Sequence, residues 1–161
     1  MNRLIVSALA SLAAIGAYAP VASADAAPAP VEVTETDTSW YGDGIAVSGK
    51  DVVSYFNEDQ PVEGSEVFST TWQNAEWQFS SQENLEAFEE NPEQYAPQFG
   101  GYCPNALALG ELKVGTPEQF AVIDEKLYLN YNYESNLAFR NDTNNLIARA
   151  NVNWGEVITG R

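Results

Sequence analysis

The chain has 161 residues, with 23 acidic against 7 basic side chains and no histidine, giving a formal net charge of −16. This charge excludes nucleic acids and anionic membrane surfaces as partners, because both require a basic face. The missing histidine excludes Ser-His-Asp and Cys-His catalysis and every histidine-ligated metal site. The acidity is typical of a highly soluble surface, and attraction of cations or of a basic partner is the alternative interpretation.

Residues 1–24 have the pattern of an export signal. Arg3 precedes an apolar stretch from Leu4 to Tyr18, and small residues end it at Ala22-Ser23-Ala24. We expect signal peptidase to cleave after Ala24, because it requires small residues at −3 and −1. The stretch is too short to span a bilayer, which takes about 20 apolar residues. The sequence therefore predicts a protein exported to the bacterial periplasm or the extracellular space, with no membrane attachment after cleavage.

A linker and one domain are expected after the signal. Residues 25–39 contain Ala-Pro-Ala-Pro followed by Glu and Thr, with few large apolar groups. Such a composition cannot repay the entropy of ordering, so this segment is predicted to be a disordered, acidic linker. Residues 40–161 are long enough to bury a core and are predicted to form a single domain.

The first elements expected in this domain are a strand, a helical turn and a hairpin. Glycines surround residues 45–47, which suggests a short strand, and Asp51 is placed to cap a brief helical turn after it. Residues 67–72 and 75–79 alternate between large and small or polar side chains, as expected of two paired strands. The intervening 73–74 pair, Gln-Asn, suits a tight hairpin turn.

Helices are expected to follow this hairpin. Ser80 and Glu83 have the spacing of a capping box, with Ser80 as the cap, and Pro92 ends the helix at about residue 91. Further along, Pro104 favours the first position of a short helix over 104–109. That assignment places Cys103 at the N-cap of the short helix.

The last third of the domain is expected to contain a second hairpin and two helices. The strands are 120–123 and 126–130, and the helices cover 133–140 and a segment that begins after Asp142. The predicted fold class is α+β, with two short antiparallel β-hairpins and small packed helices in one compact domain around an aromatic core. The apolar stripe of the last helix consists of Leu146, Ile147, Ala150 and Trp154.

Cys103 is the single cysteine, so no disulfide can form within the chain. Three interpretations stay open for it: a buried structural thiol, a soft-metal ligand, and a nucleophilic or redox thiol. A helix N-terminus favours the thiolate, but the chain provides no histidine as a base. One thiol is also fewer ligands than zinc or copper(I) requires.

Five ordered stretches resemble the exported branch of the YHS-domain proteins, and together they cover residues 42–154. The first three are GKDVVSYF (49–56), WQNAEWQFSS (72–81) and NPEQYAPQFGGYC (91–103). The other two are KLYLNY (126–131) and ANVNW (150–154). By this resemblance, residues 40–161 form a YHS-like domain.

The resemblance implies a link to metal, since the wider YHS family is associated with copper or zinc, metal pumps and oxygenases. The cysteines of its metal-associated members align with Ser54, Ser80 and Asn84 of this chain, so none of these soft ligands is present. Asp124-Glu125 also stands where the branch has Asp-Gly. Because Glu disfavours positive φ, we expect the second hairpin turn to be longer or differently shaped.

Several polar and aromatic residues within these motifs are candidates for one ligand pocket around Cys103, although each also suits a capping or packing role. Cys103 itself is the candidate ligand for copper or zinc. The leading hypothesis is a non-enzymatic binding module for a metal ion or small ligand. The alternatives are a thiol or redox enzyme that uses Cys103, and a structural or protein-interaction domain. The pocket candidates are Asp51, Tyr55, Tyr102, Cys103, Tyr128 and Asn130.

Overall fold

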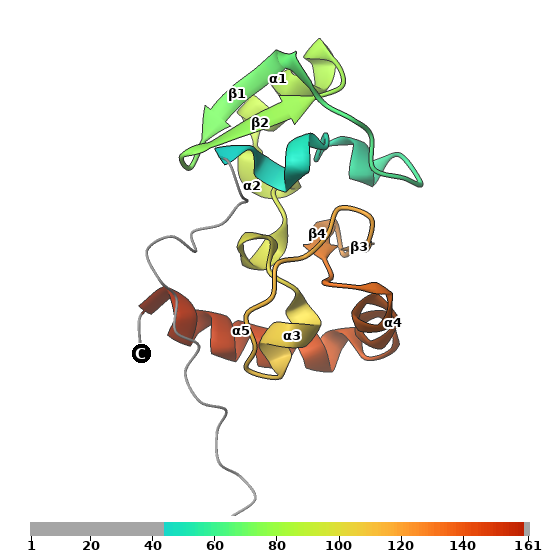
Figure 1. The fold of residues 1–161 in the computed structure, drawn as a ribbon, viewed down its shortest axis with the longest axis vertical. Coiled ribbons are helices and arrows are strands. Elements are labelled where there is room, and N and C mark those ends of the chain that lie inside the picture. Colours follow the sequence, from blue (N-terminus) through green and yellow to red (C-terminus); the bar gives the residue numbers. More distant parts are fainter. Residues whose placement is uncertain (1–43, 160–161) are drawn as a thin grey trace, which may run out of the picture.

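The computed structural model describes residues 44–159, with side chains to residue 157, and the predicted α+β class is confirmed. The predicted signal (1–24) and the whole predicted linker (25–39) lie outside the described residues. Two antiparallel two-stranded sheets, β1–β2 and β3–β4, pack with short helices in one body. In Figure 1 the β1–β2 hairpin and α1 form the upper part, the long helix α5 lies at the bottom, and β3–β4 lies between them.

The first hairpin pairs β1 (Ser65–Trp72) with β2 (Ala75–Phe79). The two connecting residues, Gln73 and Asn74, both have positive φ, at 48° and 63°. A two-residue turn of this kind matches the right-handed twist of the strands. The prediction of a tight hairpin here is confirmed. Trp77 and Phe79 are buried on one face of β2, as the alternation predicted.

Helix α1 (Gln82–Glu90) packs its Phe88 against this hairpin, with the Phe88 ring centroid 4.9 Å from that of Trp77. Its N-cap is Ser81, which accepts a hydrogen bond from the Asn84 N–H, so the prediction of Ser80 as the cap is wrong by one residue. Pro92 ends α1 and begins the single turn α2 (Pro92–Tyr95), as a proline at N1 should.

The predicted strand at residues 45–47 is wrong. Ile45 forms an isolated bridge with Glu76, and the chain then turns into the 3-10 segment η2 (Ala46–Gly49). Val47 and Ser48 have φ of 50° and 54°, so the backbone is left-handed where an extended conformation was expected. This region is unfavourable for a β-branched residue such as Val47. Its burial in the core, at 1% exposure, offsets that cost.

A second 3-10 turn, η3 (Ser54–Phe56), follows Asp51, and its N-cap position is Val53. The Asp51 side chain accepts hydrogen bonds from the Val53 and Ser54 N–H groups at the start of this turn, which is the role predicted for it. The chain then reaches η4 (Gln98–Gly101), after α2, and the short helix α3 (Pro104–Ala108). Cys103 is the residue at the N-cap position of α3, in agreement with the sequence, but its side chain makes no capping hydrogen bond.

The second hairpin consists of β3 (Phe120–Ile123) and β4 (Lys126–Leu129). Asp124 and Glu125 join the strands with φ of 49° and 58°, so the turn is as tight as the first one. The expectation of a longer or differently shaped turn is therefore wrong. Glu125 takes up the positive φ because the regular register from Ile123–Lys126 to Phe120–Leu129 requires a two-residue turn.

The chain ends in helices α4 (Tyr133–Asn141) and α5 (Thr143–Thr159). The Asn132 side chain caps α4 by accepting a hydrogen bond from the Ser135 N–H at 2.9 Å. Helix α5 begins directly after Asp142, as predicted, and packs along α3. No helix within residues 44–159 combines the length and apolar character needed to cross a membrane.

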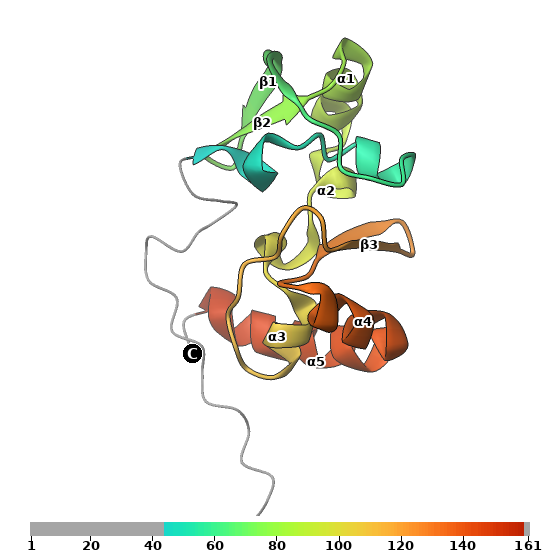
Figure 2. The same ribbon diagram turned by 45° about the vertical axis from the view of Figure 1, so that its right-hand side comes forward.

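The β3–β4 hairpin lies between two hydrophobic clusters. In Figure 2 the β1–β2 hairpin and α1 lie above β3, and α3, α4 and α5 lie below it. Successive side chains of a strand point to opposite faces, so the hairpin contributes to both clusters. The upper cluster receives Phe120, Val122, Leu127 and Leu129, and the lower cluster receives Ala121, Ile123 and Tyr128.

Candidate functional site

A buried carboxylate, that of Asp51, organises the upper part of the molecule. Its side chain is fully buried and accepts five hydrogen bonds. Oδ1 accepts from the backbone N–H groups of Val53, at 2.9 Å, and Ser54, at 3.3 Å. Oδ2 accepts from the Ser80 N–H, at 2.9 Å, the Ser80 hydroxyl, at 2.6 Å, and Asn84 Nδ2, at 2.6 Å. Both oxygens are thus satisfied, as a buried charge requires.

These hydrogen bonds join three elements that are distant in sequence. Asp51 precedes η3, Ser80 follows β2, and Asn84 lies in the first turn of α1. Hydrogen bonds to a carboxylate are shorter and stronger than those between neutral groups. The Asp51 network therefore fixes how the start of α1 sits against the η2–η3 segment.

The three positions aligned with metal-associated cysteines by resemblance are Ser54, Ser80 and Asn84, and the network contains all of them. The Ser54 hydroxyl donates to the Asp51 carbonyl at 2.7 Å, and the other two side chains donate to Oδ2. All three groups act as hydrogen-bond donors, one to the Asp51 carbonyl and two to its carboxylate, whereas a soft metal would need deprotonated thiols. They do not fit copper or zinc. Among the described residues, no three His, Cys, Asp or Glu side chains are placed to hold a metal ion.

A second buried polar site joins Cys103 and Asn130, both fully buried. The Cys103 thiol donates to Asn130 Oδ1, with 3.7 Å between Sγ and Oδ1. The Cys103 N–H donates to the Lys113 carbonyl, which ties the loop before β3 to the start of α3. Asn130 Nδ2 has no hydrogen-bond partner among the described residues. This site is less well satisfied than the Asp51 network.

The three candidate tyrosines pack within the two clusters. The Tyr55 hydroxyl donates to the Pro117 carbonyl at 3.2 Å, and its ring meets Phe120 edge to face at 4.8 Å between centroids. Burial, with a smaller effect from nearby carboxylates, raises the pKa of Tyr55 well above its usual range. Tyr102 packs on Trp154, with 6.1 Å between centroids.

Tyr128 lies between Phe99 and Phe139, with its ring centroid 6.1 Å and 5.1 Å from theirs, and burial raises its pKa. The structure thus brings Cys103 and Asn130 into contact. It places Tyr55 in the upper cluster, with Asp51 beside it, and Tyr102 and Tyr128 in the lower one. That these six residues line one ligand pocket stays a prediction.

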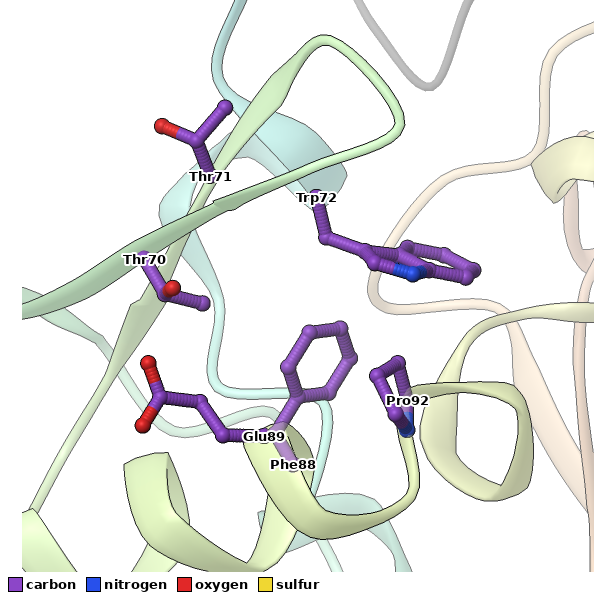
Figure 3. Close-up of a pocket in the computed structure, with 6 residues that line it drawn as sticks. All are labelled: Thr70, Thr71, Trp72, Phe88, Glu89 and Pro92. Atoms are coloured by element: carbon purple, nitrogen blue, oxygen red, sulfur yellow. The ribbon is translucent and has the colours of Figure 1, made fainter.

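An open cavity of about 290 Å³ lies between β1 and the end of α1. Figure 3 shows the Trp72 indole across from the rings of Phe88 and Pro92, while the Glu89 carboxylate extends toward Thr70. Sequence reasoning missed this site. The sequence contains no local signal for it, because the cavity forms only where α1 covers the Trp72 side of β1. The lining residues are Thr70, Thr71, Trp72, Phe88, Glu89 and Pro92.

Residues 58–99 match the YHS domain family, so the chain contains a YHS domain over this segment. YHS domains are often associated with metal-binding proteins. The segment includes Ser80, Asn84 and every residue that lines the cavity, whereas Asp51 and Cys103 lie outside it. No curated protein and no solved structure matches the chain.

Proposed function

We propose that this protein is an exported, non-enzymatic binding module, and that its YHS domain carries the binding surface. The observation that carries the proposal is the contrast between two sites. The cavity at Trp72 and Glu89 is open and lies inside the YHS segment, whereas the single thiol, Cys103, is fully buried outside it. The export pattern of residues 1–24 supports an extracytoplasmic location.

The burial of Cys103 weighs against a thiol or redox enzyme. A reactive cysteine needs access to its substrate and a thiolate-stabilising environment. Cys103 is instead fully buried, and its thiol donates a hydrogen bond to an amide oxygen. The chain also has no histidine that could act as a base. These features favour binding over thiol chemistry.

Copper or zinc at Cys103 is the metal-related form of the proposal, and it has weak support. The site offers one thiol and one amide oxygen, whereas zinc takes four ligands and copper(I) two or more soft ones. The Asp51 network further occupies the positions where metal-associated members carry cysteine. We therefore assign the ligand to the cavity and propose a small molecule in place of a soft metal.

The test uses the protein recovered from the export compartment of an expressing bacterium. Copper(I) and zinc(II) are titrated into the parent protein and Cys103→Ser, and the native thiol is labelled with an alkylating reagent. We expect no stoichiometric difference between the two proteins, labelling only after denaturation, and a mature chain that begins at Asp25. Stoichiometric metal binding lost in Cys103→Ser, or rapid native labelling, would overturn the proposal.

A further inference from the structure

We propose that the cavity between β1 and α1 binds a small organic ammonium ion, through the aromatic face of Trp72 and the carboxylate of Glu89. This inference rests on the proposed function and specifies the chemistry of the ligand. Four observations support this proposal. They concern the walls of the cavity, its charge, the end of the helix beside it and its size.

Trp72 provides the aromatic surface of the cavity, because the Phe88 ring is fully buried. The Trp72 indole is half-buried and lies across the cavity from Phe88 and Pro92 (Figure 3). Trp72 and Phe88 meet edge to face, with 5.8 Å between ring centroids and 89° between planes, so their relative orientation is fixed. The face of a tryptophan ring is the strongest aromatic acceptor of a cation, and quaternary ammonium groups are recognised by such rings.

The charge of the segment that forms the cavity has one sign. Among the described residues that line the cavity, Glu89 is the only charged one, and its side chain is exposed. The YHS segment, residues 58–99, contains ten Asp and Glu residues and no Lys or Arg, and the nearest basic residues in sequence are Lys50 and Lys113. A cleft lined by one sign of charge concentrates ions of the opposite sign. This segment therefore contains no basic side chain that could compete with a bound cation for the Glu89 carboxylate.

The end of helix α1 adds to the same field. Its last turn contains Glu89 and Glu90 and no basic residue, so the partial negative charge of the helix C-terminus is not neutralised. Acidic side chains are unfavourable at this end of a helix. A bound cation would offset this repulsion. Cation binding therefore accounts for two acidic residues at this end of α1, whereas helix stability alone does not.

Size and ligand set select an organic cation over a metal ion. A volume of about 290 Å³ is at the small end of the range for small-molecule pockets, which suits a compact head group. One carboxylate with aromatic rings offers a metal too few oxygen ligands. Alkylammonium groups, by contrast, combine a positive charge with an apolar surface that the Trp72 ring and the Pro92 side chain can contact.

The test compares choline with 3,3-dimethylbutan-1-ol, its neutral isostere, in amide-resolved NMR titrations of the full chain. We expect choline to produce saturable shifts at residues 70–72 and 88–91, and the neutral analogue to bind about tenfold more weakly. Equal binding of the two ligands, no saturable shift with choline, or tighter binding of a lysine-containing peptide than of choline would each overturn the proposal.

Two matched variants locate the site. Glu89→Gln and Glu90→Gln remove the same charge from adjacent exposed positions, but only Glu89 lines the cavity. We expect Glu89→Gln to weaken choline binding about threefold and Glu90→Gln to weaken it clearly less, because Glu90 contributes only to the field of the helix end. Equal losses would indicate diffuse attraction and contradict the assigned site. If ammonium ions fail but other small molecules shift the same residues, this inference falls and the proposed function stands. If the ligands that bind shift only residues outside 58–99, both fall.

Discussion

The two buried polar sites of the molecule differ in how completely they are satisfied. Asp51 is charged and accepts five hydrogen bonds from three elements. Asn130 is neutral, and its side chain makes one long contact, with the Cys103 thiol. A satisfied buried charge holds its surroundings in place, whereas an orphaned buried amide is a cost to stability. The comparison indicates that the upper site determines the architecture and that the lower one does not.

The largest expected effect follows from removing the upper site. Asp51→Ala would leave the Ser80 and Asn84 donors without their shared acceptor, so we expect a loss of about 4 kcal/mol in the free energy of unfolding. Urea denaturation measures this loss. The control is Asp59→Ala, an exposed acid, which should change stability by less than about 0.5 kcal/mol. A small effect of Asp51→Ala would refute the structural role of the network.

A smaller effect is expected at the lower site. Asn130→Ala removes packing but also relieves an unpaired buried N–H, so we expect a cost below about 1.5 kcal/mol. The matched control is Asn153→Ala, since Asn153 is also buried but its Nδ2 donates to the Leu107 carbonyl. Urea denaturation of both variants should show the greater loss in Asn153→Ala. The reverse order would mean that Asn130 has a partner that the described contacts do not include.

The smallest effect concerns alkaline pH. Burial raises the pKa of Tyr55, so the folded state holds the phenol proton more tightly than the unfolded chain does. This contribution is fully present below the unfolded pKa, about 10, and is lost as pH rises toward the folded pKa. Thermal unfolding followed from pH 8.5 to 11.5 should show a falling midpoint above about pH 10.

The Tyr55→Phe variant should show a shallower alkaline decline than the parent protein. Tyr133→Phe, which alters a tyrosine that is 65% exposed, should leave the parent slope unchanged. A slope that is the same in all three proteins would assign the alkaline decline to other groups.

Most of the elements could be predicted because their signals are local. The alternation in 67–72 and 75–79, and the prolines at 92 and 104, act within one strand or one helical turn. The failures have a different cause. Val47 takes a left-handed backbone that its own side chain disfavours, and Glu125 does so because the strand register requires it. Long-range packing overrides local preference in both places.

The candidate site was harder to predict for the same reason. Asp51 was recognised as a cap from its neighbours, but its partners Ser80 and Asn84 lie 29 and 33 residues further along the chain. The cavity likewise forms only when α1 covers the strand that carries Trp72. No periodicity or capping pattern in a single sequence specifies these contacts, because side chains from separate elements come together only in the packed structure.

The position of the β3–β4 hairpin has a consequence for folding. Because its alternate side chains enter both clusters, neither half can detach without exposing one apolar face of the hairpin to water. An intermediate in which only one of the two clusters is folded is therefore destabilised by the apolar face of the hairpin that it exposes. The two clusters should unfold together, as a single cooperative unit, even though each has its own aromatic centre.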